Sequence, residues 1–159
     1  EIVSGVSYSK NESKITISGI PDKPGISAEI FGLLASKNIN VDMIVQNISQ
    51  DGISANITFT VPNSEIIYAK KILRNDLNFI SYHSIKTDEK VSKISVIGMG
   101  MMSQSGVAQK MFKTLAENSI NILAISTSEI KISVLIDEKF TNIAVQSLHN
   151  AYNLEYKDE

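Results

Sequence analysis

The segment at positions 22–27, Asp-Lys-Pro-Gly-Ile-Ser, has the composition of a turn that leads into a helix and could bind a ligand. The first N–H groups of a helix have no partner within the helix, and the helix dipole adds positive potential there. A carboxylate is the natural ligand of such groups. Pro24 fixes one dihedral angle of the turn, and Gly25 lets a ligand approach the backbone. The alternative is a plain tight turn, because these residue types are common in turns that bind nothing.

Polar side chains follow on the strand that is expected at positions 41–49. Asp42 and Gln46 share parity, so both are predicted to point to one face, and Asn47 comes next in the chain. An acid and an amide on an otherwise apolar strand suit an ammonium group or a polar amino-acid side chain. The alternative is a solvated strand edge, since Asp and Gln are usually exposed.

An internal repeat duplicates this candidate site. The two copies align at an offset of 81 positions (106 minus 25), and the identical pairs include Gly25 and Gly106, Phe31 and Phe112, Leu34 and Leu115, and Asn40 and Asn121. A repeat of this kind makes one structural unit of each half of the chain. The second copy carries hydroxyl groups at Ser126, Thr127 and Ser128, which could bind a ligand or satisfy a strand end.

Hydrophobic periodicity predicts the elements that would position these residues. Alternating apolar residues predict strands, and apolar stripes at helical spacing predict helices. For the first half the predicted elements are strand 14–20, helix 26–35, strand 41–49, a hairpin turn at 50–52, strand 53–61, helix 66–73 and strand 80–85. For the second half they are strand 94–97, helix 107–116, strands 121–128 and 130–136, and helix 140–151.

The segment 2–8 also has a strand pattern but no role in the first unit, while the second unit lacks its last strand. We therefore predict that this segment completes the second sheet, so that the first unit is inserted within the second. The expected fold class is α+β, with two ferredoxin-like βαββαβ sandwiches, each an antiparallel sheet with its helices on one face. The predicted domains are 13–88 for the first unit, and 1–12 plus 89–159 for the second.

Composition argues against several classes of function. The 159 residues carry a net charge of −2 and Arg74 is the only arginine, so nucleic-acid binding is not expected. No cysteine is available for a disulfide, a thiol nucleophile or a thiolate metal site, which fits a cytoplasmic protein. No stretch is long and apolar enough to span a membrane. His83 and His149 lie far from any acidic or hydroxyl motif, so no catalytic residue, metal or cofactor is predicted.

A family resemblance rests on four segments above all: Asp-Lys-Pro-Gly at 22–25, Ile-Asn-Val-Asp-Met-Ile-Val-Gln-Asn at 39–47, Lys-Ile-Ser-Val-Ile-Gly at 93–98 and Ile-Ser-Thr-Ser-Glu-Ile at 125–130. With most of the remaining chain, they resemble the tandem ACT domains of the aspartate kinase regulatory region. The resemblance implies feedback control of the first step toward lysine, threonine and methionine. Lysine, threonine or both would bind between ACT units of paired chains, which implies a homodimer formed through these domains.

The resemblance also implies what the chain cannot do alone. The catalytic segment of aspartate kinase, with its Lys-x-Gly-Gly start, is absent from these residues, so this chain by itself is not expected to phosphorylate aspartate. It would be either a cut regulatory region or a separate regulatory subunit, and its partner would be the catalytic domain or subunit.

Two effector sites follow from the resemblance. One would be lined by Asp22, Gly25, Ile26, Ser27, Gln46, Asn121 and Ile122. A lysine-type site would be lined by Asp42, Thr127 and Ser128 with the loop near Met101 and Met102, and Asp42 would face the ε-ammonium group. Asn47 is counted among the effector-binding residues. Ile26 replaces a more usual polar residue and Ser27 an alanine, so lysine and threonine both stay candidate effectors.

Two other functions stay open on the sequence alone. One is a purely structural dimerisation module that binds no effector. The other is an RNA-binding ferredoxin-like protein, which would need aromatic residues on its central strands, whereas these strands carry mainly Ile, Thr and Ser.

Overall fold

The computed structural model describes residues 3–77, 80–98 and 104–154. It divides the chain into two compact units, each of which is described by itself. The inserted unit is Asn11–Glu89, and the split unit combines Glu1–Lys10 with Lys90–Glu159. The predicted insertion of one unit within the other is thus confirmed. No helix in the described part of the chain has both the length and the apolar character needed to cross a membrane.

The elements alternate between strands and helices in both units. The inserted unit contains most of β1 (Gly5–Pro21), α1 (Ile26–Ser36), β2 (Ile44–Ile48), β3 (Ser54–Val61), the short 3-10 helix η1 (Asn63–Glu65), α2 (Ile66–Asp76) and the beginning of β4 (Ser84–Ile97). The split unit contains the beginning of β1, the end of β4, α3 (Gln104–Glu117), β5 (Ala124–Thr127), β6 (Lys131–Asp137), the 3-10 helix η2 (Glu138–Phe140) and α4 (Thr141–Ala151).

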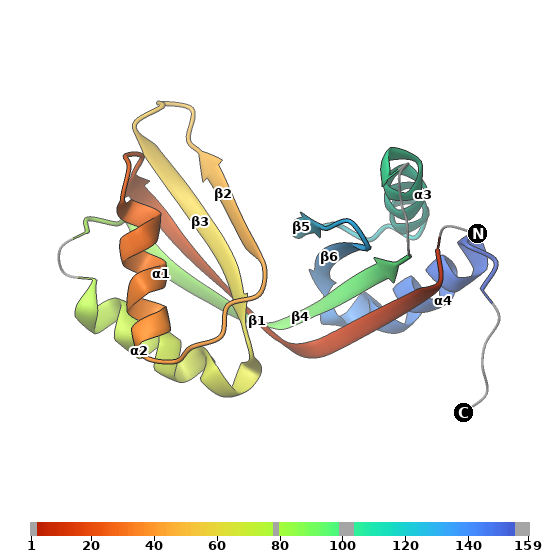
Figure 1. Ribbon diagram of the computed structural model, residues 1–159, viewed down its shortest axis with the longest axis horizontal. Helices are drawn as coiled ribbons and strands as arrows, with labels where there is room; N and C mark the ends of the chain where they lie inside the picture. The colour runs from red at the N-terminus through yellow and green to blue at the C-terminus, as the bar shows by residue number, and fades with distance from the viewer. Residues whose placement is uncertain (1–2, 78–79, 99–103, 155–159) are drawn as a thin grey trace. The chain divides into compact units, whose positions relative to one another are not determined.

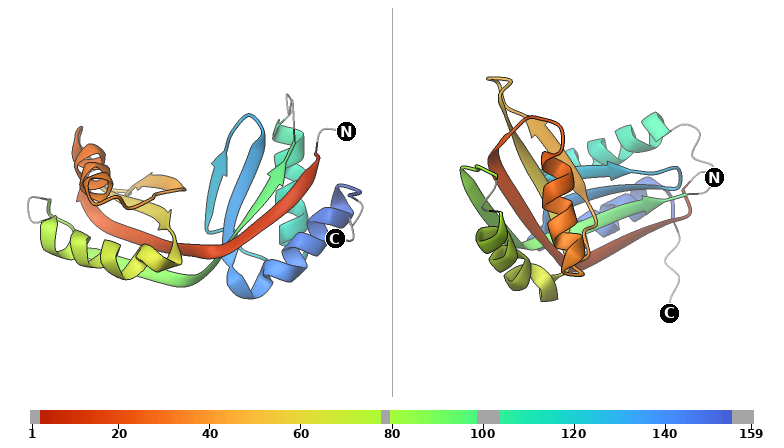
Figure 2. Two further views of the ribbon diagram at one scale, coloured as in Figure 1. Left: turned by 60° about the horizontal axis from the view of Figure 1, so that its bottom comes forward. Right: turned by 60° about the vertical axis from the view of Figure 1, so that its left-hand side comes forward.

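Each unit is a sheet with two helices on one face (Figure 1 and Figure 2). In the inserted unit the strand order is β2-β3-β1-β4, and β3 pairs antiparallel with both β1 and β2. In the split unit the order is β1-β4-β6-β5, and β6 pairs antiparallel with both β4 and β5. This arrangement confirms the predicted α+β fold class of two ferredoxin-like sandwiches.

Alternating apolar side chains build the core between the sheet and the helices. In the inserted unit, Ile17 of β1 lies directly opposite Ile57 of β3, and both are fully buried. Ile30 and Leu34 of α1 pack into the same cluster. Burying one such side chain contributes about 1.5–3 kcal/mol. The spacing of apolar residues therefore determines which face of each strand the helices cover.

Helices α1 and α3 end in the same way, 81 positions apart. After α1 the N–H of Ile39 donates to the carbonyl of Leu34 at 3.1 Å, and after α3 the N–H of Ile120 donates to the carbonyl of Leu115 at 3.0 Å. The residues before them, Asn38 and Ser119, have left-handed φ angles of 58° and 56°. This is the Schellman pattern of hydrogen bonds, which satisfies carbonyl groups at a helix end. The sequence repeat is thus a repeat of backbone geometry.

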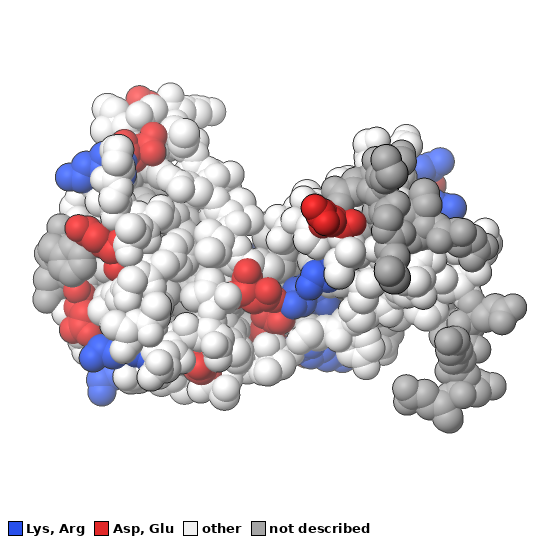
Figure 3. Space-filling model, viewed as in Figure 1, with Lys and Arg blue, Asp and Glu red and all other residues white. Residues whose placement is uncertain are grey.

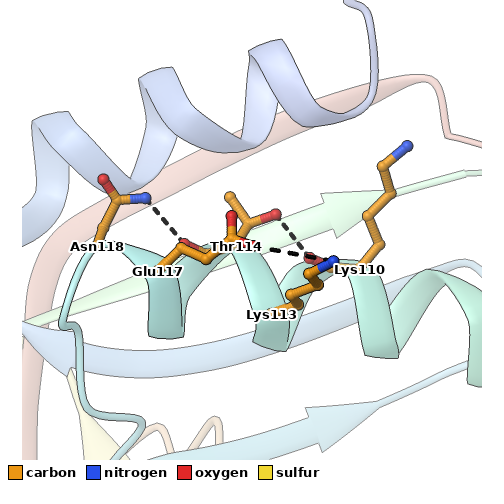
Figure 4. Close-up of polar contacts among 5 residues, drawn as sticks. All are labelled: Lys110, Lys113, Thr114, Glu117 and Asn118. Carbon is orange, nitrogen blue, oxygen red and sulfur yellow. Dashed lines mark hydrogen bonds and ion pairs between the residues drawn. The ribbon is translucent and has the colours of Figure 1, made fainter.

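Local polar contacts stabilise the exposed side and the end of α3 (Figure 4). The Thr114 hydroxyl donates to the carbonyl of Lys110 at 2.7 Å, and the Asn118 side-chain amide donates to the carbonyl of Thr114 at 2.8 Å. The second bond satisfies one of the last carbonyls of the helix. Lys113 Nζ lies 3.9 Å from Glu117 Oε1, an exposed pair that contributes little stability.

The start of α3 is joined to the end of α4 by Tyr152. Its phenol donates to the carbonyl of Val107 at 2.6 Å, and Lys110 Nζ lies 5.4 Å from the centre of its ring. Burial raises the pKa of the Tyr152 phenol to about 12. The hydroxyl is therefore held in its neutral, hydrogen-bonding form.

The prediction of separate strands at 2–8 and 14–20 was wrong, because β1 runs without interruption from Gly5 to Pro21. Likewise β4 runs from Ser84 to Ile97, so it contains only the last two residues of the predicted strand 80–85 and continues through the segment expected to cross between the units into the predicted strand 94–97. Polar residues at these junctions resemble a linker in the sequence. In the structure these residues belong to β1 and β4, which are hydrogen-bonded neighbours in the sheet.

Two smaller predictions also need correction. The strand expected at 41–49 is only β2, Ile44–Ile48, so Asp42 precedes it. Ile53 was expected to begin the next strand as a core residue, but it lies before β3 and is 74% exposed. In each case a long-range contact determines the backbone more than the local pattern does.

Candidate functional site

The turn before α1 presents the start of a helix without a side-chain cap. Gly25 is the residue before the first helical position, and its φ of 95° lies in the left-handed region that favours glycine. Its carbonyl accepts the N–H of Glu29 at 3.0 Å, but no side chain caps the helix. A Cβ added at Gly25 would meet no heavy atom within 4 Å apart from those of its chain neighbours. The predicted turn therefore leaves room for a ligand beside the first N–H groups of α1.

The side chains of this turn differ in what they can offer a ligand. Asp22 and Gly25 are exposed and Ser27 is half-buried. Ile26 is buried in the core of the inserted unit, so only its backbone N–H can face a ligand. The presence of Ile26 at a position where the resembled family more usually has a polar residue thus leaves the backbone N–H donors of α1 in place. The helix dipole and these N–H groups together favour an anionic group.

A backbone hydrogen bond attaches this turn to the β2–β3 hairpin. The N–H of Asp22 donates to the carbonyl of Ile53 at 3.0 Å. The hairpin tip is organised by Asp51, whose Oδ1 accepts the N–H groups of Ile53 at 2.8 Å and Ser54 at 3.2 Å. The Ser49 hydroxyl also donates to Asp51, and these bonds, above all the one from Ser49, hold the pKa of the exposed carboxyl below its usual 3.8. The start of α1 and the tip of β2 accordingly lie at the same end of the unit (Figure 1).

Gln46 and Asn47 lie on β2 near that end and point to opposite faces. Gln46 is directly opposite Ile57, and Asn47 is directly opposite Asn56. Directly opposite residues share a face of the sheet, and Ile57 belongs to the core under the helices. Gln46, which is exposed, is therefore on the same side of the sheet as α1, and Asn47 is on the other side.

Asp42 lies at the other end of β2, and the structure does not bring it together with the α1 turn. Its N–H donates to the carbonyl of Thr60 at 3.1 Å, and its side chain is exposed. The next residue, Met43, donates its N–H to the Thr60 hydroxyl at 3.0 Å. Asp42 therefore lies in the segment between the C-terminal end of α1 and β2, and not beside the N-terminal end of α1.

The split unit repeats the link between turn and hairpin. The N–H of Gly98, at the end of β4, donates to the carbonyl of Ile130 at 2.9 Å, as Asp22 does to Ile53. Thr127 is the last residue of β5 and lies directly opposite Ile132. The N–H of Ser128 donates to the carbonyl of Lys131 at 2.8 Å, and both hydroxyl side chains are exposed.

The other assigned residues of the split unit lie before β5. Asn121 is exposed, and Ile122 packs against the core of the split unit. Met101 and Met102 lie outside the described residues. The residues assigned to each effector site are thus divided between the inserted unit and the split unit. Within the described ranges, no three His, Cys, Asp or Glu side chains are grouped so that they could hold a metal ion.

An exposed apolar strand edge is a feature that was not predicted. β2 is the last strand of its sheet, and Ile44 and Ile48 on it are 52% and 63% exposed. In the view of Figure 3, the surface over the upper part of β2 shows almost no Lys, Arg, Asp or Glu. The apolar residues were visible in the sequence, but the strand pattern alone cannot tell an edge strand from a central one.

Comparison with known proteins shows what the chain is similar to. The ACT domain family matches residues 11–77 and 94–152. An aspartate kinase of Pseudomonas fluorescens is 47% identical over 154 residues, which are 97% of this chain and 37% of that protein. The chain thus spans little more than a third of the length of this curated relative.

Solved structures agree in both sequence and fold. A chain from the crystal structure of aspartokinase alpha and beta subunits is 47% identical, with a TM-score of 0.89 and 96% of this chain and 99% of that chain covered. The regulatory subunit of aspartate kinase from Thermus thermophilus, in its ligand-free form, is 34% identical with a TM-score of 0.89 and the same coverage.

Proposed function

This chain belongs to the ACT-domain regulatory region of the aspartokinases, without the catalytic domain, and we propose that it binds free lysine, threonine or both as a feedback effector. Binding would inhibit aspartate phosphorylation by the associated catalytic domain or subunit, in the cytoplasm. The single observation that carries the proposal is the uncapped start of α1 behind Gly25, which has open space beside it.

The first step of effector binding is recognition of the α-carboxylate. Every free amino acid carries this group, and the N–H groups at the start of a helix suit it in charge and geometry. The exposed Gln46 amide, on the helix side of β2, can then hydrogen-bond the amino acid from the sheet. Asp22 adds a carboxylate at the same turn for the α-ammonium group.

The second step is recognition of the side chain. The exposed carboxylate of Asp42 suits the ε-ammonium group of lysine, because opposite charges attract. The exposed hydroxyls of Thr127 and Ser128 can accept hydrogen bonds from an ammonium group. Asn121 and Ile122 would complete the effector site at the start of α1 with a polar and an apolar contact.

The third step is assembly. Each proposed site combines residues of the inserted unit with residues of the split unit, so we propose that the sites form between ACT units of paired chains. The β2 edge, with exposed Ile44 and Ile48, fits pairing with a second copy by strand addition. A ligand bound across such an interface favours one arrangement of the subunits, typically by about 1–3 kcal/mol.

Titration calorimetry of the chain with lysine and with threonine tests the proposal. We expect saturable heat with at least one of them, and no heat with Nε-acetyl-lysine at the lysine-type site, because acetylation removes the charge that Asp42 recognises. Absence of saturable heat with both amino acids at millimolar concentration would contradict effector binding.

A structural dimerisation module without effector binding is the second candidate. The exposed apolar β2 edge favours it, because this surface supports pairing whether or not a ligand is present. Sedimentation of the chain with and without lysine and threonine separates the two functions. An identical dimer dissociation constant under all conditions, together with silent calorimetry, would favour the structural module.

A further inference from the structure

Strand β1 contains an irregularity three residues before the proposed effector turn. Ile17 pairs with Ile57 and Ile20 pairs with Ala55, so Ser18 and Gly19 together oppose the single residue Asn56. This is a β-bulge, a feature that bends a strand and redirects the residues beyond it. Gly19 has a left-handed φ of 72°, and a Cβ there would lie 2.7 Å from the Cβ of His83.

The bulge reverses the facing of β1. Before the bulge, the residues of β1 that point into the core are at odd-numbered positions, such as Ile15 and Ile17. Regular alternation would place Gly19 in the core next. Because of the extra residue, Ile20 points inward instead and is 1% exposed. Pro21, which lies opposite Ser54, and then Asp22 come directly after Ile20 in the chain. The position of the effector turn on the sheet therefore depends on the bulge.

Two backbone groups of the bulge form hydrogen bonds outside the backbone ladder of β1 and β3. The carbonyl of Ser18 accepts the N–H of His83 at 2.7 Å. The N–H of Gly19 donates to Oδ1 of Asn56 at 3.1 Å, and both residues are half-buried. A side-chain oxygen on β3 thus replaces the backbone partner that the extra residue has displaced.

We propose that Asn56 is a positioning residue for effector binding, which acts by holding the Gly19 bulge and through it the turn from Asp22 to Ser27. This inference rests on the proposed function. The proposed role of Asn56 is to fix the backbone whose N–H groups contact the ligand, without contacting the ligand itself. Pro21 and Asp22 follow the bulge and contact the β2–β3 hairpin, Pro21 by pairing with Ser54 and Asp22 by its hydrogen bond to Ile53. The bulge determines the register of these two contacts.

Three variants of the full chain test the proposal. Asn56→Ala removes the acceptor of the Gly19 N–H, and we expect effector affinity at the α1 site to fall roughly threefold to tenfold, as for loss of one hydrogen bond. Asn56→Asp keeps an acceptor oxygen and is expected to restore affinity. Asn142→Ala, an exposed asparagine in α4, is the matched control and should leave affinity unchanged.

Hydrogen exchange of residues 19–25 provides a readout that is independent of any effector. Asn56→Ala should speed exchange in this segment more than elsewhere in the inserted unit, and Asn56→Asp should reverse the change. Unchanged affinity and unchanged local exchange in Asn56→Ala would overturn the proposal. If the wild-type chain binds neither lysine nor threonine, the proposed function fails, while the exchange rates still decide whether Asn56 holds the turn.

Discussion

Gln46 of β2 lies directly opposite Ile57 of β3, which places its amide on the face of the sheet that the helices cover. Asn47, one position later, is opposite Asn56 and on the other face. We therefore expect Gln46→Ala to weaken effector binding about tenfold, the loss typical of one well-placed hydrogen bond to a charged group. Asn47→Ala is the matched control and should change affinity less. Calorimetry measures both, and equal losses would contradict the assignment of faces.

Gly25→Ala should destabilise the inserted unit by about 1–2 kcal/mol, because a residue with a Cβ is strained at a φ of 95°. Gly32→Ala is a control for which the expected change in the free energy of unfolding has the opposite sign. Gly32 is exposed within α1 and has open space, so alanine there should stabilise by about 0.5–1 kcal/mol. Urea denaturation measures both changes. A neutral or stabilising Gly25→Ala would show that the turn relaxes to another conformation.

Asp51 should contribute a pH-dependent share of stability. Its folded pKa is lowered, so the stabilisation is fully present above the ordinary value of 3.8 and is lost as the pH falls through the lowered pKa. Asp51→Asn should remove this part of the acid dependence and loosen the hairpin that holds Asp22. Thermal unfolding at a series of acidic pH values tests this expectation. Identical acid profiles for the variant and the wild type would contradict it.

Tyr152 should make the folded chain less stable at strongly alkaline pH. Its folded pKa is raised to about 12, so the neutral phenol is favoured in the folded chain. The stabilisation is present below the unfolded value of 10.0 and is lost as the pH rises through the folded pKa. Tyr152→Phe should remove this alkaline loss and, near neutral pH, cost about 1 kcal/mol for the bond to Val107. Tyr68→Phe, at an exposed position, should do neither.

The β2 edge should control assembly. Ile48→Lys places a charge on an exposed apolar strand edge, which disfavours pairing with a second copy. We expect the dissociation constant of the proposed dimer to rise at least tenfold. Ile67→Lys is the control, because Ile67 is 81% exposed on α2, away from that edge. Sedimentation equilibrium compares the two. Equal weakening by both variants would argue that the edge has no special role.

Much of the fold could be predicted because the repeat and the apolar periodicity reflect local geometry. The Schellman ends at Asn38 and Ser119 follow the repeat, and buried Ile15, Ile17 and Ile57 follow the alternation. The strand at 2–8 was assigned to the second sheet because that unit lacked one strand. These features depend on neighbours along the chain or on the number of elements in each unit.

What could not be predicted depends on long-range contacts. The shift from odd to even between Ile17 and Ile20, with Gly19 between them, is the sequence signal of the bulge, but its partner Asn56 is 37 positions away from Gly19. The faces of Gln46 and Asn47 follow from the register with β3 rather than from their types. The placement of Asp42 before β2 depends on its bond to Thr60.

The most direct test of the central claim compares each amino acid with its carboxamide. If the uncapped start of α1 binds the α-carboxylate, the wild-type chain should bind lysine or threonine saturably in calorimetry, and the matching amide, lysinamide or threoninamide, should give no saturable heat. Equal binding of the acid and its amide, or binding of neither, would contradict the account.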